Sequence, residues 1–154
     1  MSRRVAVMVC VFASALAGVG AQTKAPPSSS VRGVWRVVGI AAGARGSTSD
    51  AAALPGVFIF TEKHYSMVRV TAERPDLKEA ANATYEDRFK VWSPFQAASG
   101  TYEATGSVIR LVPIVAKEPF MMTPGVFQLA TFAIAGNTLS ITQGAVTVKL
   151  ARVE

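Results

Sequence analysis

The chain of 154 residues contains one histidine, His64, and one cysteine, Cys10. A single imidazole excludes sites that need two of them and weakens any Ser-His mechanism. Cys10 lies in an apolar N-terminal run, so the rest of the chain has no thiol for disulfides, nucleophilic catalysis or thiolate metal sites. We interpret His64 as an ordinary exposed or hydrogen-bonded residue, with a lone haem or metal ligand as the alternative. We therefore expect no catalytic residues, no metal site and no cofactor.

Two arginines lie within apolar segments that predict strands. Tyr65, Met67 and Arg69 share one face of a strand because alternate residues share a side, and Arg110 shares a face with two valines on another strand. An arginine that points into a barrel can bind a carboxylate through two parallel N–H donors. The alternative is that both arginines point to solvent.

The segment 55–70 predicts how these residues are positioned. Two apolar runs, 57–60 and 65–70, are rich in branched and aromatic residues and flank a short polar turn at 61–63. This pattern predicts a β-hairpin. A single hairpin is only marginally stable, so further strands must cover its apolar faces.

The remaining sequence supplies those strands. They are predicted at 33–40, 99–104, 107–114, 125–134, 138–142 and 145–153, with tight turns at Thr105-Gly106, Gly136-Asn137 and Gln143-Gly144. The residues between them at 41–54, 71–78 and 115–124 read as loops. Eight short antiparallel strands in up-and-down order predict an all-β closed barrel, which has room for packed side chains or one small ligand. A two-sheet sandwich is the alternative.

One helix is predicted at 79–92, between the third and fourth strands. Apolar residues repeat there on one face, and the helix should end at Ser93-Pro94. The residues on that face are Ala81, Tyr85, Phe89 and Trp92. We interpret this aromatic face as core packing, with a lid that faces a ligand as the alternative.

The N-terminus has the pattern of an export signal. A basic Arg3-Arg4 pair precedes an apolar core at 5–16 and small residues before Gln22, which predicts a signal peptide at 1–21 and a periplasmic or secreted protein. A retained anchor is the alternative. A Pro/Ser linker is predicted at 22–32, and one barrel domain at 33–154.

The net charge of +6 is dispersed along the chain. The sequence has no cluster of basic residues of the kind that indicates nucleic-acid binding. We also expect no stable membrane insertion. We expect a monomer or a weak homo-oligomer.

Several segments together resemble the bacterial lipocalin-like domain family. They are Gly33-Val-Trp-Arg-Val-Val, Pro55 to Val68, Ser99-Gly-Thr-Tyr and Gly136-Asn-Thr-Leu-Ser-Ile, followed by Arg152 on the last strand. The resemblance spans nearly all of 33–153 and implies a calycin-type barrel with a small-molecule cavity. A closed barrel must pair its first and last strands, which brings Arg152 near Trp35, and the resemblance also implies that the Arg152 guanidinium stacks on the Trp35 indole. Gly33, Trp35 and Arg152 are therefore expected to be structural residues.

We therefore expect a carrier that holds a small apolar or amphipathic molecule in its barrel. The alternative is an enzyme that uses the same cavity for isomerisation, cyclisation or hydrolysis, and a third hypothesis is a structural or inhibitory module with a filled barrel. The residues expected to line the cavity are Phe58, Phe60, Tyr65, Met67, Arg69, Phe89, Trp92, Tyr102 and Arg110. The inward face of any one strand remains open, because both faces of some strands are apolar.

Overall fold

A computed structural model describes residues 31–42, 54–77 and 81–154 of the chain. The predicted signal peptide, most of the predicted linker and most of the predicted loop at 41–54 lie outside these residues.

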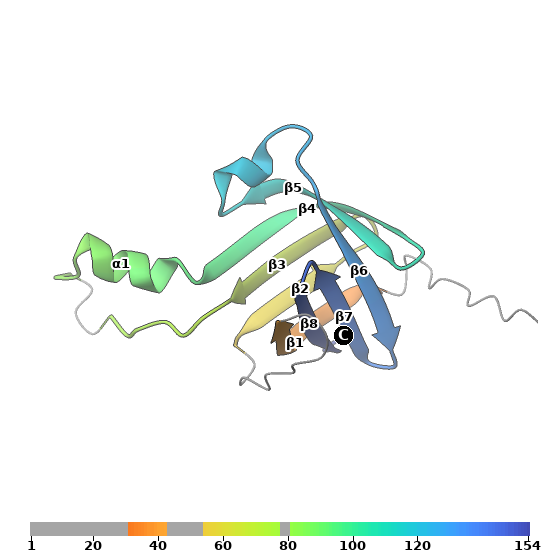
Figure 1. Cartoon of the computed structure of the whole chain (residues 1–154), viewed down its shortest axis with the longest axis horizontal. Coiled ribbons are helices and arrows are strands. Elements are labelled where there is room, and N and C mark those ends of the chain that lie inside the picture. The colour runs from red at the N-terminus through yellow and green to blue at the C-terminus, as the bar shows by residue number, and fades with distance from the viewer. Residues whose placement is uncertain (1–30, 43–53, 78–80) are drawn as a thin grey trace, which may run out of the picture.

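Eight strands form one closed antiparallel barrel, which confirms the predicted fold class (Figure 1). Each strand pairs with the next in sequence, and the first pairs with the last. The strands are β1 (Gly33–Ala42), β2 (Gly56–Phe60), β3 (His64–Val70), β4 (Phe95–Thr105), β5 (Val108–Ala116), β6 (Gln128–Ala135), β7 (Thr138–Gln143) and β8 (Val146–Arg152). A helix, α1 (Tyr85–Trp92), lies between β3 and β4, and a short 3-10 helix, η2 (Pro119–Met122), lies between β5 and β6.

The turns follow from local sequence. Gly106, Gly136 and Gly144 have φ between 56° and 62°, a left-handed conformation that glycine adopts without steric cost. In the turn between β2 and β3, the Thr61 hydroxyl accepts a hydrogen bond from the His64 backbone N–H at 3.1 Å. These four turns make β2 and β3, β4 and β5, β6 and β7, and β7 and β8 antiparallel hairpins.

The antiparallel order defines two ends of the barrel. The closed end is where β1 begins and β8 ends, and the open end is where β3 ends and β4 begins. Large inward side chains fill the closed end, because each strand contributes at least one buried residue there. They include Trp35, Phe60, Tyr65, Tyr102, Ile109, Phe132, Leu139 and Leu150.

The boundaries of α1 differ from the prediction at its N-terminus. Thr84 caps the helix: its hydroxyl accepts from the Asp87 backbone N–H at 3.2 Å, and the Asp87 carboxylate accepts from the Thr84 backbone N–H at 3.1 Å. This reciprocal capping box starts the helix at Tyr85. Its C-terminal cap is Ser93, so the predicted stop is confirmed.

The interpretation of the aromatic face of α1 as core packing is wrong. No residue of α1 is buried, and Tyr85, Phe89 and Trp92 are 84%, 56% and 55% exposed. Figure 1 shows the reason: α1 projects from the open end, away from the barrel wall. The helical spacing therefore predicted the element correctly and its environment incorrectly.

Hydrogen bonds join the C-terminal end of α1 to the segments that follow β3 and β5. The Lys117 ammonium donates to the carbonyls of Trp92 and Ser93 at 2.9 and 3.1 Å, and Arg74 donates to the carbonyl of Val91 at 2.8 Å. Cations at this position also complement the helix dipole. In the described part of the chain, no helix has the length and apolar character needed to cross a membrane.

Candidate ligand-binding site

A cavity of about 280 Å³ occupies the open half of the barrel. Strands of a barrel turn alternate side chains inward, and most of the side chains that line the inner part of this cavity are apolar. The apolar lining consists of Phe58, Met67, Ala97, Leu111, Met121, Ala130, Ile141, Val146 and Val148. Its volume lies just below the roughly 300–1,000 Å³ common for small-molecule sites.

Polar side chains line the rest of the cavity, and they come from positions at the open end of the barrel. Three glutamines continue the inward faces of their strands, and Arg69 does the same on β3. Lys117 and Glu118 come from the segment after β5 and form an ion pair at 3.7 Å. The glutamines are Gln96 on β4, Gln128 on β6 and Gln143 on β7. The cavity therefore has an apolar interior and a polar mouth.

Arg69 is the charged group that the strand architecture turns inward. Its Nε donates to Oε1 of Gln96 at 2.8 Å, which fixes the guanidinium beside the opposing strand. Partial burial lowers the pKa of Arg69, because removal from water disfavours the charged form. No acidic side chain of the described segments forms an ion pair with it. The guanidinium thus retains donors for an anionic group in the cavity mouth.

Tyr65 lies one inward position deeper on β3 than Met67. It is only 3% exposed, and burial raises its pKa to about 12 because the phenolate is poorly solvated there. Its hydroxyl has no hydrogen-bond partner among the described residues. The hydroxyl of Tyr102, by contrast, donates to the carbonyl of Thr61 at 2.8 Å.

The structure brings three of the nine predicted residues into the cavity lining: Phe58, Met67 and Arg69. Phe60 and Tyr102 belong to the packed closed end, where their rings form an edge-to-face contact with centroids 5.2 Å apart. Tyr65 is buried next to this group and outside the lining. Whether any of these residues contacts a ligand stays a prediction.

The other three predicted residues lie outside the barrel. Phe89 and Trp92 are exposed on α1. Arg110 lies on the outer face of β5, where its guanidinium is 4.4 Å from the Phe127 ring centroid and 3.8 Å from the Glu103 carboxylate. Both faces of β5 are apolar in sequence, and the structure turns Ile109 and Leu111 inward. The expectation that Arg110 points into the cavity is therefore corrected.

Sequence reasoning missed the glutamines and the segment after β5. A signal for the glutamines exists, because each is two residues from a buried apolar residue on the same strand: Gln96 from Ala98, Gln128 from Ala130 and Gln143 from Ile141. For Lys117 and Glu118 no comparable periodicity exists, since they lie between β5 and η2.

The closed end contains the predicted Trp35 and Arg152 contact. The Arg152 guanidinium carbon lies 4.1 Å from the Trp35 ring centroid, within the about 6 Å of a cation–π contact. The indole N–H donates to the carbonyl of Val31 at 2.8 Å. The Val31 side chain is itself buried, so this residue of the predicted linker belongs to the core. Gly33 has φ of 133°, and a Cβ there would overlap the Arg152 guanidinium.

Comparison with known proteins finds no matching family model, and no matching curated protein or solved structure.

His64 is exposed at the start of β3, and the described residues contain no group of three or more His, Cys, Asp or Glu side chains that could hold a metal ion. The candidate site therefore rests on the geometry of the cavity.

Proposed function

We propose that the protein is a carrier that binds a small amphipathic acid in the barrel cavity. The observation that carries this proposal is Arg69, a guanidinium turned inward at the mouth of an apolar cavity without an ion-pair partner in the described residues. A carboxylate on the ligand would accept hydrogen bonds from the guanidinium, and the apolar part of the ligand would lie against Phe58, Met67 and Leu111.

The electrostatics of the mouth favour an anion. Lys117 adds a second positive charge, and the amides of the three glutamines can donate hydrogen bonds. Glu118 offsets part of this charge, but its ion pair with Lys117 directs the two side chains toward each other. Arg69 is thus the charged group in the mouth that is left for a ligand.

The cavity volume limits the ligand. A volume of about 280 Å³ is just below the roughly 300 Å³ at which small-molecule sites usually begin. The site therefore suits a small molecule such as octanoic acid. Long fatty acids would extend beyond the mouth.

We further propose that the barrel belongs with the bacterial lipocalin-like domains and that the chain is exported. The stacked Trp35 and Arg152 beside Gly33, together with the closed barrel, support the first proposal. The basic and apolar pattern of residues 1–21 supports the second. Intact mass of protein recovered from its host tests export: a chain that starts near Gln22 is expected, and an uncleaved chain would contradict it.

Titration calorimetry with octanoate and its methyl ester tests the binding proposal. Arg69→Gln should weaken octanoate binding by about 10- to 100-fold, the range for loss of charge-assisted hydrogen bonds, and should leave ester binding nearly unchanged. Arg110→Gln is the matched control, because it removes an arginine from the outer face of the barrel. If octanoate does not bind, or if Arg69→Gln weakens octanoate and ester equally, the proposal is refuted.

A further inference from the structure

Arg69 and Gln96 form a side-chain pair across two neighbouring strands at the mouth of the cavity. The two residues lie directly opposite each other in the pairing of β3 with β4, and both side chains line the cavity. The Arg69 Nε donates to the Gln96 Oε1 at 2.8 Å, a distance typical of a well-formed hydrogen bond. The orientation of the charged group therefore depends on a neutral side chain of the opposing strand.

The bond to Gln96 determines which donors of Arg69 remain. A guanidinium has five N–H donors in one plane, and only one of them is on Nε. Gln96 takes the Nε donor, and neither Nη atom of Arg69 donates to another described residue. The two Nη atoms are spaced to bind both oxygens of one carboxylate through parallel hydrogen bonds. The pair therefore holds the guanidinium and leaves an edge of it that fits a carboxylate.

The amide of Gln96 suits this position because it accepts a hydrogen bond without adding a charge. A glutamate in its place would accept the same bond, but it would pair with Arg69 and cancel the positive charge. A methionine has similar length and is only a weak acceptor, so the guanidinium would sample more orientations. Glutamine thus provides both the orientation and an uncompensated positive charge.

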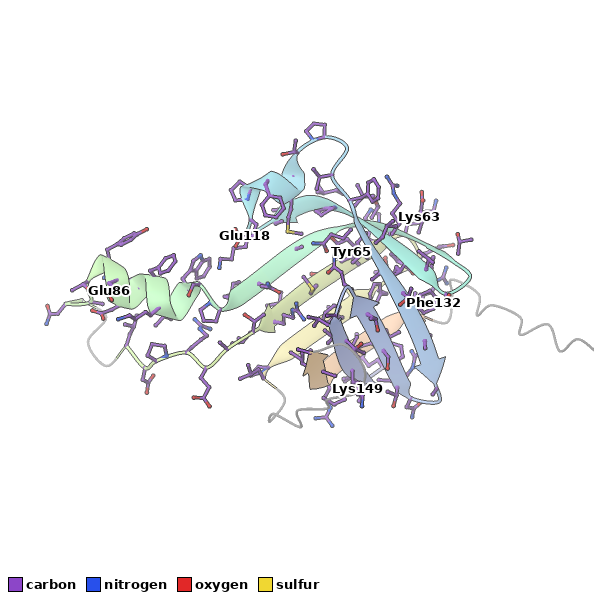
Figure 2. The ribbon with its side chains drawn as sticks, viewed as in Figure 1. Lys63, Tyr65, Glu86, Glu118, Phe132 and Lys149 are labelled. Carbon is purple, nitrogen blue, oxygen red and sulfur yellow. The ribbon has the colours of Figure 1, made fainter. Side chains whose placement is uncertain are left out.

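The acidic side chain of the mouth does not neutralise Arg69. Glu118 is the one acidic residue among the described residues that line the cavity, and its carboxylate pairs with Lys117 at 3.7 Å. Figure 2 shows Glu118 beside η2, which follows β5, whereas Arg69 lies near the end of β3. Burial lowers the pKa of Arg69, as expected for a guanidinium that has lost water without gaining a carboxylate. The charge of Arg69 is therefore left for a ligand.

We propose that Gln96 is a positioning residue that gives the mouth its selectivity for carboxylates. It fixes the Arg69 guanidinium with both Nη atoms left for the two oxygens of a carboxylate, and its neutral amide preserves the positive charge. The ligand class is thus a carboxylic acid in its ionised form, bound in preference to the corresponding ester. The inference rests on the proposed function, because Gln96 acts through Arg69.

Calorimetry on the full chain with octanoate and its methyl ester tests this role. Gln96→Met should weaken octanoate binding about three- to fivefold, because Arg69 keeps its charge and loses its orientation. Gln96→Glu should weaken octanoate binding about tenfold or more, because the new carboxylate occupies the guanidinium. Both variants should bind the ester within about twofold of wild type. If acid and ester weaken together, Gln96 has only a structural role and the inference is overturned.

Gln143→Glu is the matched control for the added negative charge. Gln143 also lines the cavity mouth, and in the described part of the chain its side chain makes no hydrogen bond to Arg69. This substitution should weaken octanoate binding by no more than about threefold, because a charge without direct contact is screened by water. An equal loss in Gln143→Glu and Gln96→Glu would show that any negative charge in the mouth has this effect, which would overturn the inference.

A double-mutant cycle tests whether Gln96 acts through Arg69. In the Arg69→Gln background, Gln96→Met should change octanoate binding by less than about twofold. The same loss with and without Arg69 would show that Gln96 contacts the ligand itself, and the positioning role would be overturned. If Arg69→Gln weakens octanoate binding and neither substitution of Gln96 does, the carrier function stands and the inference fails. Absence of octanoate binding to wild type refutes both proposals.

NMR of the wild-type protein decides the question if the Gln96 variants do not fold. The Arg69 Nε–H signal, assigned through the bonds of its own side chain, should exchange slowly with water in the free protein, because Gln96 accepts this hydrogen. Octanoate should slow the exchange of the Arg69 Nη hydrogens and leave the Nε–H protected. An Nε–H that exchanges fast in the free protein, or that becomes protected only with octanoate, would overturn the inference.

Discussion

Replacement of Arg152 by lysine tests how the closed end is held together. The guanidinium stacks 4.1 Å from the Trp35 ring centroid, and its Nη1 donates to the carbonyls of Arg32 at 2.7 Å and Glu154 at 3.3 Å. Lysine keeps the charge and can reach one carbonyl, but it loses the planar stack. The substitution therefore isolates the shape of the side chain from its charge.

The expected loss follows from these contacts. A cation–π contact is worth ~1 kcal/mol at exposed sites and ~2 kcal/mol when desolvated, and the second hydrogen bond adds ~1 kcal/mol. Arg152→Lys should lower the free energy of unfolding by about 2 kcal/mol. With a urea m-value of ~1–3 kcal/mol/M, the unfolding midpoint falls by about 1 M.

Urea unfolding, followed by tryptophan fluorescence, measures this shift. Arg36→Lys is the matched control, because Arg36 follows Trp35 on β1 and is exposed. Its substitution should change the free energy of unfolding by no more than ~0.5 kcal/mol. If the midpoints of Arg152→Lys and wild type coincide, the stack does not stabilise the barrel. An equal loss in both variants would show that any Arg→Lys change has this effect, and it would equally refute the reasoning.

Three further predictions concern the fold. Gly33→Ala should lower the urea midpoint more than Gly125→Ala does. Both positions have positive φ, but only at Gly33 would the new Cβ overlap Arg152. Equal losses of stability in the two variants would contradict this explanation. The free energy of unfolding should fall by about 2 to 3 kcal/mol as pH rises from about 10 to 12, because the folded state then keeps a proton on Tyr65 that the unfolded state has released. Tyr65→Phe should flatten this part of the pH profile. An unchanged profile in Tyr65→Phe would argue against burial of the hydroxyl. Thr84→Ala removes the capping box and should destabilise α1 by about 1 kcal/mol. Hydrogen exchange measures this as faster exchange of the α1 amides with no change in β4. Unchanged exchange in α1 would show that the helix does not depend on its cap.

The strands and turns were predictable because their determinants are local. Alternation of apolar residues and glycines suited to positive φ indicate where the strands and the tight turns lie. The bounds are less exact: β4 begins at Phe95 and not at the predicted residue 99, and β6 begins at Gln128 and not at the predicted residue 125. The contact between Arg152 and Trp35 followed from one further step, because a closed barrel must pair its first strand with its last.

The lining of the cavity was only partly predictable. On β3 alternation predicted that Met67 and Arg69 share a face, and the structure turns that face inward. On β5 both faces carry apolar residues, so periodicity does not decide between Arg110 and Leu111. The register with β4 and β6 decides it, and register depends on the neighbouring strands.

The sequence by itself determined eight antiparallel strands in up-and-down order, a helix between the third and fourth strands, and the residues that share each strand face. Only the tertiary structure decided that the strands close into a barrel and not into a two-sheet sandwich, and which faces turn inward. It also decided that the aromatic face of α1 is exposed at the open end and that the Tyr65 hydroxyl is buried without a partner in the described residues. The physical reason is the range of the forces involved. Turn geometry and alternation act between residues close in sequence, whereas burial and cavity shape depend on where distant strands meet when the barrel closes.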